Sequence, residues 1–413
     1  MGKKTLLLII SIILTFSVCV YGESTDEIEN IEEMEEDIVN PIVERAIILE
    51  AGEIEAAEDN RDIFGENQKI KLEVISGEYK GKIFEIEHGI SGNPSFDVIV
   101  KNGDKVIIGI EEHGEGNLKV YIMQHLRQNY ILYLVILFIL LLIVIGRMKG
   151  LKSIITLSLT MIAILKILLP LMLKGMNPIL ITILVSVGIT IFTVFIVSGI
   201  NNKSIATIIG TSGGVLLAGI IAYIIGNKAN LTGFSSEEAV MLMYTPQGIK
   251  FDMKGILFSG IIMGALGAVM DVGMSISSSI DEVYNANKDL TREELFSAGM
   301  NVGKDVMGTM TNTLILAYTG SSIPLLLVFM AYKTSIQEII NLDVVATEII
   351  RSLAGSIGLV LTIPLTALVA SLLLKRKEDS GKEKGYIYNQ EYEKDIGAGE
   401  YEANKESSEI KND

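Results

Sequence analysis

The sequence has few residues of the kinds that carry redox and metal chemistry. Its 413 residues include one cysteine, three histidines and no tryptophan. The cysteine, Cys19, lies inside the first apolar stretch, so neither a disulfide framework nor a cysteine-based metal site is expected. His88 and His113 are too isolated to predict ligands. We therefore expect no metal and no cofactor.

Two sequence motifs of enzymes and pumps are also missing. There is no G-x-x-x-x-G-K-[ST] loop for ATP and no H-E-x-x-H zinc motif. The serines at 277–279 have no histidine near them in the sequence, because the last histidine is His125. We expect the chain not to be an enzyme, and it is not a primary pump in itself.

Charge and apolar residues are separated along the chain. The sequence is 49% hydrophobic and only 6% aromatic, with a net charge of -16 and a mean hydropathy of +0.45. Residues 23–128 carry 26 acids against 10 bases and so account for the imbalance. The remainder is very apolar, which is unusual for a soluble protein. Without a basic patch in the acidic part, we expect no nucleic-acid partner.

The N-terminus has the pattern of a secretory signal. Lys3 and Lys4 precede an apolar run over residues 6–20, and residues 20–22 suit a signal peptidase. We predict a signal peptide at 1–22, with an uncleaved signal anchor as the alternative. Residues 23–37 contain nine acids and no base, which predicts a solvated acidic linker over 23–40.

Residues 41–128 have the period-two alternation of β-strands. Asn102-Gly103 is expected to form a type I′ turn between strands centred on Ile99 and Ile108. Gly77 and Gly81 offer a second turn. About five strands in such a short stretch predict a small extracytoplasmic β-barrel of the OB or SH3 kind.

The rest of the chain predicts a polytopic α-helical membrane protein with about seven transmembrane helices. The first predicted span is followed by Arg147, Lys149 and Lys152, and the last by Lys375, Arg376 and Lys377. This excess of basic residues places the N-terminal domain outside and the C-terminus in the cytoplasm, ahead of a disordered tail at 375–413. The predicted spans are 129–146, 151–173, 178–199, 205–226, 255–277, 309–332 and 352–374.

The fifth span carries a carboxylate among small residues. One helix face is shared by residues that recur at intervals of three to four, namely Gly260, Gly264, Ala268, Asp271, Ser275 and Ser278. Small residues allow close helix packing, so we expect Asp271 to point into the bundle as a proton or cation site. The alternative is a structural carboxylate paired with a base such as Lys304.

The sixth span combines a polar stripe with a predicted break. Lys304, Gly308, Asn312 and Thr319 belong to this stripe, which we expect to face the fifth span. Gly320 and Pro324 interrupt the apolar run and predict a broken helix whose free backbone groups could hold an ion or substrate. The alternative is an ordinary proline kink in which serine and threonine hydroxyls satisfy the freed backbone groups.

Three stretches carry a family resemblance: GALGAVMDVGMSISSSIDEV, GMNVGKDVMGTMTNTLILAYTGSS and GSIGLVLTIPLTA. They resemble the signature stretches of the YibE/F-like family of bacterial membrane proteins. The resemblance covers roughly residues 42–374 and implies a multi-pass protein of the bacterial plasma membrane. It places the family's polar positions on Asp271, Asp305 and Asn312.

Two functional classes follow from these observations. The first is a secondary transporter or permease, with Asp271 as the proton or cation site and Thr319 and Ser322 in the substrate-facing region. The second is a non-transporting scaffold or sensor whose β domain binds an envelope partner. The expected partners are the lipid bilayer, a small solute or ion, and a second copy of the chain or another membrane protein.

Overall fold

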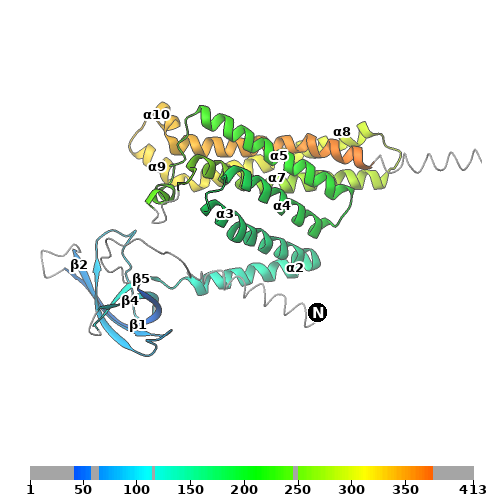
Figure 1. Cartoon of the computed structure of the whole chain (residues 1–413). Helices are drawn as coiled ribbons and strands as arrows, with labels where there is room; N and C mark the ends of the chain where they lie inside the picture. The colour runs from blue at the N-terminus through cyan, green and yellow to red at the C-terminus, as the bar shows by residue number, and fades with distance from the viewer. Residues whose placement is uncertain (1–40, 57–64, 114–116, 245–249, 375–413) are drawn as a thin grey trace, which may run out of the picture. The chain divides into compact units, whose positions relative to one another are not determined.

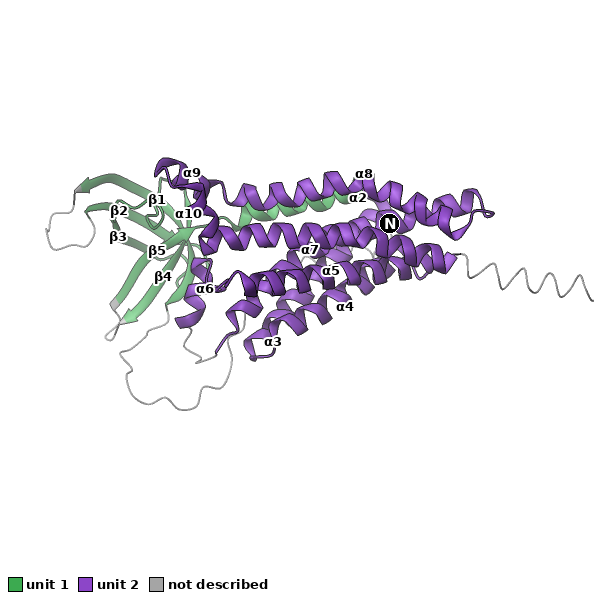
Figure 2. Cartoon of the chain, turned by 90° about the horizontal axis from the view of Figure 1, so that it is seen from above, with its two compact units in different colours: residues 1–144 green, residues 145–413 purple. Residues whose placement is uncertain are grey.

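The computed structural model describes residues 41–56, 65–113, 117–244 and 250–374. The chain divides into two compact units, residues 1–144 and 145–413, coloured separately in Figure 2. The predicted signal peptide (1–22), acidic linker (23–40) and C-terminal tail (375–413) lie outside the described residues.

The first unit contains an antiparallel five-stranded sheet that curls into a half-barrel (Figure 1). Its strand order is β3-β2-β1-β4-β5, so the long strand β1 is central. Irregular register between Ile48 and Glu50, and between Ala51 and Ile54, bends β1 against β2. The strands are β1 (Ile42–Ala56), β2 (Glu66–Val74), β3 (Ile83–Ile90), β4 (Lys105–His113) and β5 (Asn117–His125).

The half-barrel has its own hydrophobic core. Alternate residues of the strands are buried on the inner face, as the period-two pattern requires. Two polar side chains, Glu44 and Gln68, are buried among them. The Gln68 amide donates to the carbonyls of Gly52 and Val100 at 3.1 and 3.0 Å, and the Glu44 carboxylate accepts from the Ser76 hydroxyl and the Glu78 N–H. The aliphatic core is Ala46, Ile48, Ile70, Leu72, Val74, Val100, Val106, Ile108, Ile110, Val120 and Ile122.

One of the two predicted turns is wrong in type. Gly77 and Gly81 do have positive φ, in the connection between β2 and β3. At Asn102-Gly103 only Gly103 has positive φ (86°), whereas a type I′ turn needs it at both positions. Residues 97–101 form no strand. They cannot pair with β4 because β1 and β5 already occupy both of its edges.

The helical part begins with α2 (Gln128–Ala163), which is broken at Arg147 (φ 48°, ψ -123°). It continues through a π-helix, η2 (Ile164–Leu168), into α3 (Leu169–Leu173). Together these form one apolar stretch, Gln128–Leu173, of 46 residues. Within the described residues, five helices are long and apolar enough to cross a membrane, or six if one bent pair counts as a single span.

The second unit is a helical bundle around α7. This helix packs against α4, α5 and α8, and most of its aliphatic side chains are buried. We call the last helix, Asp343–Leu374, the C-terminal helix. The remaining elements are α4 (Pro178–Ser198), α5 (Asn202–Lys228), α6 (Glu237–Met241), η3 (Leu242–Tyr244), α7 (Met253–Ala286), α8 (Arg292–Ser321), α9 (Ile323–Ala331) and α10 (Ile336–Asn341).

Glycine and threonine residues bring three of these helices into close contact. A Cβ atom on Gly214 of α5 would overlap Thr362 of the C-terminal helix, and one on Gly273 of α7 would lie 2.7 Å from Thr211 Oγ1. Such contacts draw backbones together where no water drives helices to associate. Residues 210–214 also spell G-x-S-x-G. They lie inside α5 and not at a strand-to-helix turn, so they do not form a nucleophile elbow.

Two helices begin earlier than their predicted spans. Helix α8 begins at Arg292 and not near 309, because Thr291 and Glu294 form a capping box at its N-terminus. The C-terminal helix begins at Asp343 and not near 352. In both helices a polar first part precedes the apolar stretch.

Candidate functional site

The α8–α9 break is the feature that organises the candidate site. Helices α8 and α9 are bent by 59° at a break that contains Ser322. Pro324, at the start of α9, has no backbone N–H to continue the helical ladder. The predicted broken helix is therefore present.

The carbonyl freed at this break is satisfied by side chains. The Ser322 N–H bonds to the carbonyl of Thr319 at 3.1 Å, which leaves the Tyr318 carbonyl without its usual partner. The hydroxyls of Ser321 and Ser322 donate to that carbonyl, at 2.7 and 3.2 Å. This is the arrangement expected of a proline kink in which hydroxyl groups satisfy the freed carbonyl.

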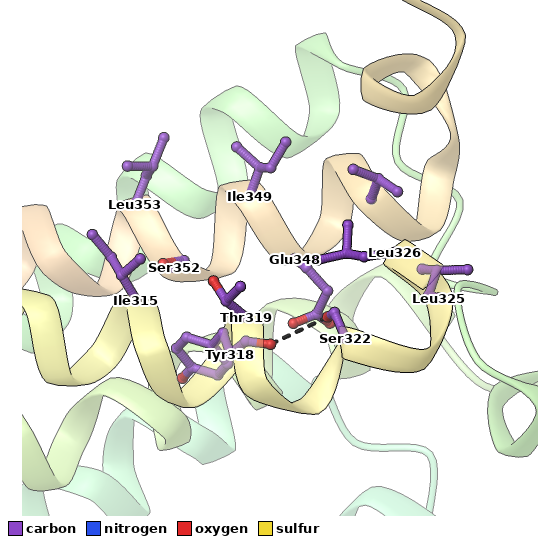
Figure 3. Close-up of a pocket in the computed structure, with 11 residues that line it drawn as sticks. Ile315, Tyr318, Thr319, Ser322, Leu325, Leu326, Glu348, Ile349, Ser352 and Leu353 are labelled. Carbon is purple, nitrogen blue, oxygen red and sulfur yellow. Dashed lines mark hydrogen bonds between the residues drawn. The ribbon is translucent and has the colours of Figure 1, made fainter. Parts of the chain in front are cut away.

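A cavity of about 330 Å³ lies beside the break, between α8, α9 and the C-terminal helix (Figure 3). Its walls are mainly aliphatic. Thr319, Ser322, Glu348 and Ser352 bring polar groups to it. In Figure 3 the Glu348 side chain extends from the C-terminal helix toward Ser322. The full lining is Ile315, Tyr318, Thr319, Ser322, Leu325, Leu326, Val345, Glu348, Ile349, Ser352 and Leu353.

Glu348 is largely buried and paired with an arginine on its own helix. Arg351, one turn later, donates from Nη1 to Glu348 Oε1 at 2.6 Å, and both side chains are about three-quarters buried. The second carboxylate oxygen, Oε2, is buried and has no hydrogen-bond partner among the described residues, and neither does Arg351 Nε. A buried, unsatisfied polar atom costs free energy. The pair therefore has unused capacity for a bound group.

Tyr318 connects this site to α7. A Cβ atom on Gly264 would lie 2.5 Å from the Tyr318 hydroxyl oxygen, so the absent side chain makes room for the phenol. Gly264 belongs to the small-residue face of α7, and this contact is one place where that face packs against α8.

The remainder of that face does not point inward as predicted. Gly260, Asp271 and Ser275 are exposed in the bundle, and no atom lies within 4 Å of a Cβ placed on Gly260. The reason is that α4, α5 and the C-terminal helix pack on the larger side chains of α7, such as Ile262 and Val269. The prediction that Asp271 points into the bundle is therefore wrong for the isolated chain.

The predicted stripe on α8 is also largely exposed. Lys304, Asp305 and Asn312 are exposed, and α8 packs on α7 and the C-terminal helix through Gly299, Gly303 and other residues. Within the described part of the chain, neither Asp271 nor Lys304 has an ion-pair partner. Lys203 of α5 instead approaches Asp281 of α7 at 3.6 Å.

Of the five predicted site residues, the structure thus brings Thr319 and Ser322 together at one cavity. Asp271, Asp305 and Asn312 do not line it. Glu348 and Arg351 were missed, because they precede the predicted seventh span. The signal was present in TEIIRS, where opposite charges stand three residues apart in an apolar context. Across the described ranges no group of three or more His, Cys, Asp or Glu residues could hold a metal.

Five or six membrane-length helices, a partly polar cavity between three helices of the bundle, and a separate β domain define a multi-span helical membrane protein. Residues 134–376 match the family described as YibE/F-like protein, and residues 42–125 match the YibE/F family N-terminal domain. The chain belongs to the YibE/F-like family. No curated protein and no solved structure matches it.

Proposed function

We propose that the chain is a secondary transporter, or permease, that binds a small solute or ion in the cavity beside the α8–α9 break. The observation that carries this proposal is the buried Oε2 atom of Glu348 beside that cavity, which has no hydrogen-bond partner among the described residues. Ionisable residues inside membrane bundles are costly and commonly belong to substrate or ion pathways. Broken helices commonly form such sites in transporters.

We further propose seven spans in the bacterial plasma membrane, with the β domain outside and the C-terminus in the cytoplasm. The apolar stretch Gln128–Leu173 has 46 residues, which as helix is about 69 Å long, more than twice the hydrocarbon core of about 30 Å. The break at Arg147 divides it into two lengths that can each span. Basic residues near this break support a cytoplasmic turn.

Asp271 remains the proposed coupling site for a proton or cation. It lies near the middle of α7, on an exposed face, without an ion-pair partner among the described residues. A charged carboxylate does not face acyl chains at that depth, so it must be hydrated, protonated or covered. Hydration or protonation of Asp271 would suit ion coupling.

A covered Asp271 would instead favour the second candidate function, a non-transporting scaffold or sensor. In that case another protein surface would pack on the exposed face of Gly260, Asp271 and Ser275. A second copy of the chain or a different membrane protein would fit, because small residues permit close helix contact. The half-barrel would then bind an envelope partner.

Vesicles reconstituted with the purified protein distinguish the two functions. We expect an imposed proton or sodium gradient to collapse faster than in protein-free vesicles when the transported solute is present. Asp271→Asn removes the charge and the titratable proton, so it should abolish coupling. Because the substitution keeps the side-chain volume, it should not lower the melting temperature in detergent. Asp289→Asn, in the exposed loop before α8, is the matched control and should behave as wild type.

Two results would contradict the transporter. The first is a wild-type protein that leaves both gradients unchanged across a broad panel of solutes. The second is an Asp271→Asn variant that accumulates poorly or melts early, because that result assigns the carboxylate a structural role and supports the scaffold.

A further inference from the structure

The cavity beside the α8–α9 break opens between side chains that are exposed on the outside of the bundle. Ile315, Leu326, Ile349 and Leu353 line it and are 36%, 37%, 39% and 50% exposed. Exposed aliphatic side chains on membrane-spanning helices contact lipid chains. A ligand can therefore enter this cavity from the bilayer.

The size and the aliphatic walls of the cavity favour a ligand with one hydrocarbon chain and a small polar head group. Its volume of about 330 Å³ is at the lower end of ligand pockets, which occupy about 300–1,000 Å³. Most of its lining is aliphatic, with polar groups from Thr319, Ser322, Glu348 and Ser352. A phospholipid with two chains and a large head group is too big for this space.

The polar atoms next to the cavity favour a head group that donates hydrogen bonds. Glu348 Oε2 is a buried acceptor with no partner among the described residues. The Ser322 hydroxyl already donates to the Tyr318 carbonyl, so its oxygen is left as an acceptor. Arg351 balances the charge of Glu348 from the same helix but does not line the cavity. An anionic head would meet the acceptors Glu348 Oε2 and Ser322 Oγ, and among the lining residues it would find only neutral hydroxyl donors and no positive charge.

We propose that this cavity binds a single-chain amphiphile from the bilayer, with a primary ammonium as its head group. The chain lies along the aliphatic wall, and the ammonium donates to Glu348 Oε2 and Ser322 Oγ. This inference rests on the proposed function in one respect, since it names the substrate class of the proposed transport site.

The absence of tryptophan makes binding directly measurable. Leu353→Trp places a single fluorophore at the cavity, and Leu368→Trp places one elsewhere on the same helix with nearly equal exposure, 50% against 49% for the native leucines. Each protein is reconstituted in phosphatidylcholine vesicles and titrated with amphiphiles that share one brominated, quenching chain. Their heads are a primary ammonium, a trimethylammonium or a sulfonate.

The primary amine should quench Leu353→Trp saturably, at a membrane concentration about tenfold below that of the sulfonate, as expected for one charge-assisted hydrogen bond. The trimethylammonium probe carries the same charge without a donor and should bind more weakly than the amine. At Leu368→Trp all three probes should quench equally and without saturation. Equal quenching by all heads at Leu353→Trp would overturn the proposal.

Glu348→Gln provides a second, directional test in the Leu353→Trp background. The substitution can replace the free acceptor by an amide donor, and it leaves Arg351 as a net positive charge. The preference should therefore invert, with the sulfonate binding more tightly than the amine. A retained amine preference would count against Glu348 as the head-group partner. If this variant does not fold, the head-group series on Leu353→Trp with native Glu348 tests the proposal by itself.

Binding and transport fail separately in these experiments. Saturable amine binding without any gradient change in vesicles would support the amphiphile site and contradict the transporter. Gradient-coupled transport without an amine preference would support the transporter and contradict the amphiphile site.

Discussion

Single charged residues in apolar helices do not identify a site by themselves. Asp271 stands out in the sequence because small residues surround it, yet the bundle leaves it exposed. Glu348 stands out less, but it faces a cavity and has Arg351 one turn away as a counter-charge. What distinguishes the two carboxylates is the surrounding packing, which spacing along one helix does not encode.

His88 of the half-barrel provides a residue-scale prediction about pH. Burial lowers the pKa of His88 below its usual 6.5, although hydrogen bonding to the Val98 backbone and the nearby Asp97 oppose this. The unfolded chain therefore binds the proton more readily than the folded sheet does. The stability that neutral His88 contributes should be complete above pH 6.5 and should be lost as the pH falls from there through the lower folded-state pKa.

Thermal melts of a fragment spanning residues 41–126 test this expectation between pH 7.5 and 5.5. The wild-type fragment should melt at a lower temperature at pH 5.5, and an NMR titration should place the pKa of the His88 ring below 6.5. The His88→Gln fragment should lose most of the pH dependence over this range. Identical pH dependence in both fragments would show that other groups cause it.

At the scale of elements, most strands and helices could be predicted, whereas several of their ends and faces could not. Hydropathy located α4 and α5 nearly to their ends, because their apolar runs nearly coincide with the helices. It also located α7, but not its polar last turns, because the predicted span ends at 277 and the helix continues to Ala286. It missed the first part of α8, where the helix is polar and a capping box, not an apolar window, marks its start. It also could not decide which face of α7 is covered, since small residues suit both a packed face and a bare one.

Two glycine-to-alanine substitutions compare the packed face of α5, at Gly214, with the exposed face of α7, at Gly260. A methyl group at Gly214 would overlap Thr362 and lie 2.8 Å from the carbonyl oxygen of Gly358, whereas one at Gly260 meets open space. Overpacking typically costs about 1–3 kcal/mol, and alanine is otherwise favoured over glycine in a helix by about 1 kcal/mol. Gly214→Ala should therefore lower the melting temperature in detergent, while Gly260→Ala should leave it unchanged or raise it.

Both variants are helical glycines replaced by the same residue, so each controls for the other. A melting temperature that falls for Gly260→Ala but not for Gly214→Ala would reverse the assignment of the α7 face. If Gly260→Ala alters the oligomeric state and not the melting temperature, the exposed face of α7 contacts another protein.

At the scale of the whole molecule, the sequence predicted a β domain followed by membrane helices, and both are present. Family membership was also predictable, because residues 264–283, 299–322 and 355–367 retain recognisable stretches in order. The cavity was not predictable, since its lining comes from α8, α9 and the C-terminal helix. Glu348 and Thr319 come together only once the bundle has formed.

The number of membrane crossings depends on the stretch Gln128–Leu173. If this stretch crosses twice, with a turn at Arg147, then Phe96 of the β domain and Glu237 of α6 lie on the same side of the membrane. If it crosses once, they lie on opposite sides.

Single cysteines at these two positions and at Lys288, in a Cys19→Ser background, therefore determine the topology. All three native residues are exposed, so the introduced thiols can react. With an impermeant thiol reagent on whole cells, we expect labelling at 96 and 237 and protection at 288, with all three labelled after permeabilisation. Labelling at 96 and 288 together with protection at 237 would mean that the long stretch crosses once and that the seven-span proposal is wrong.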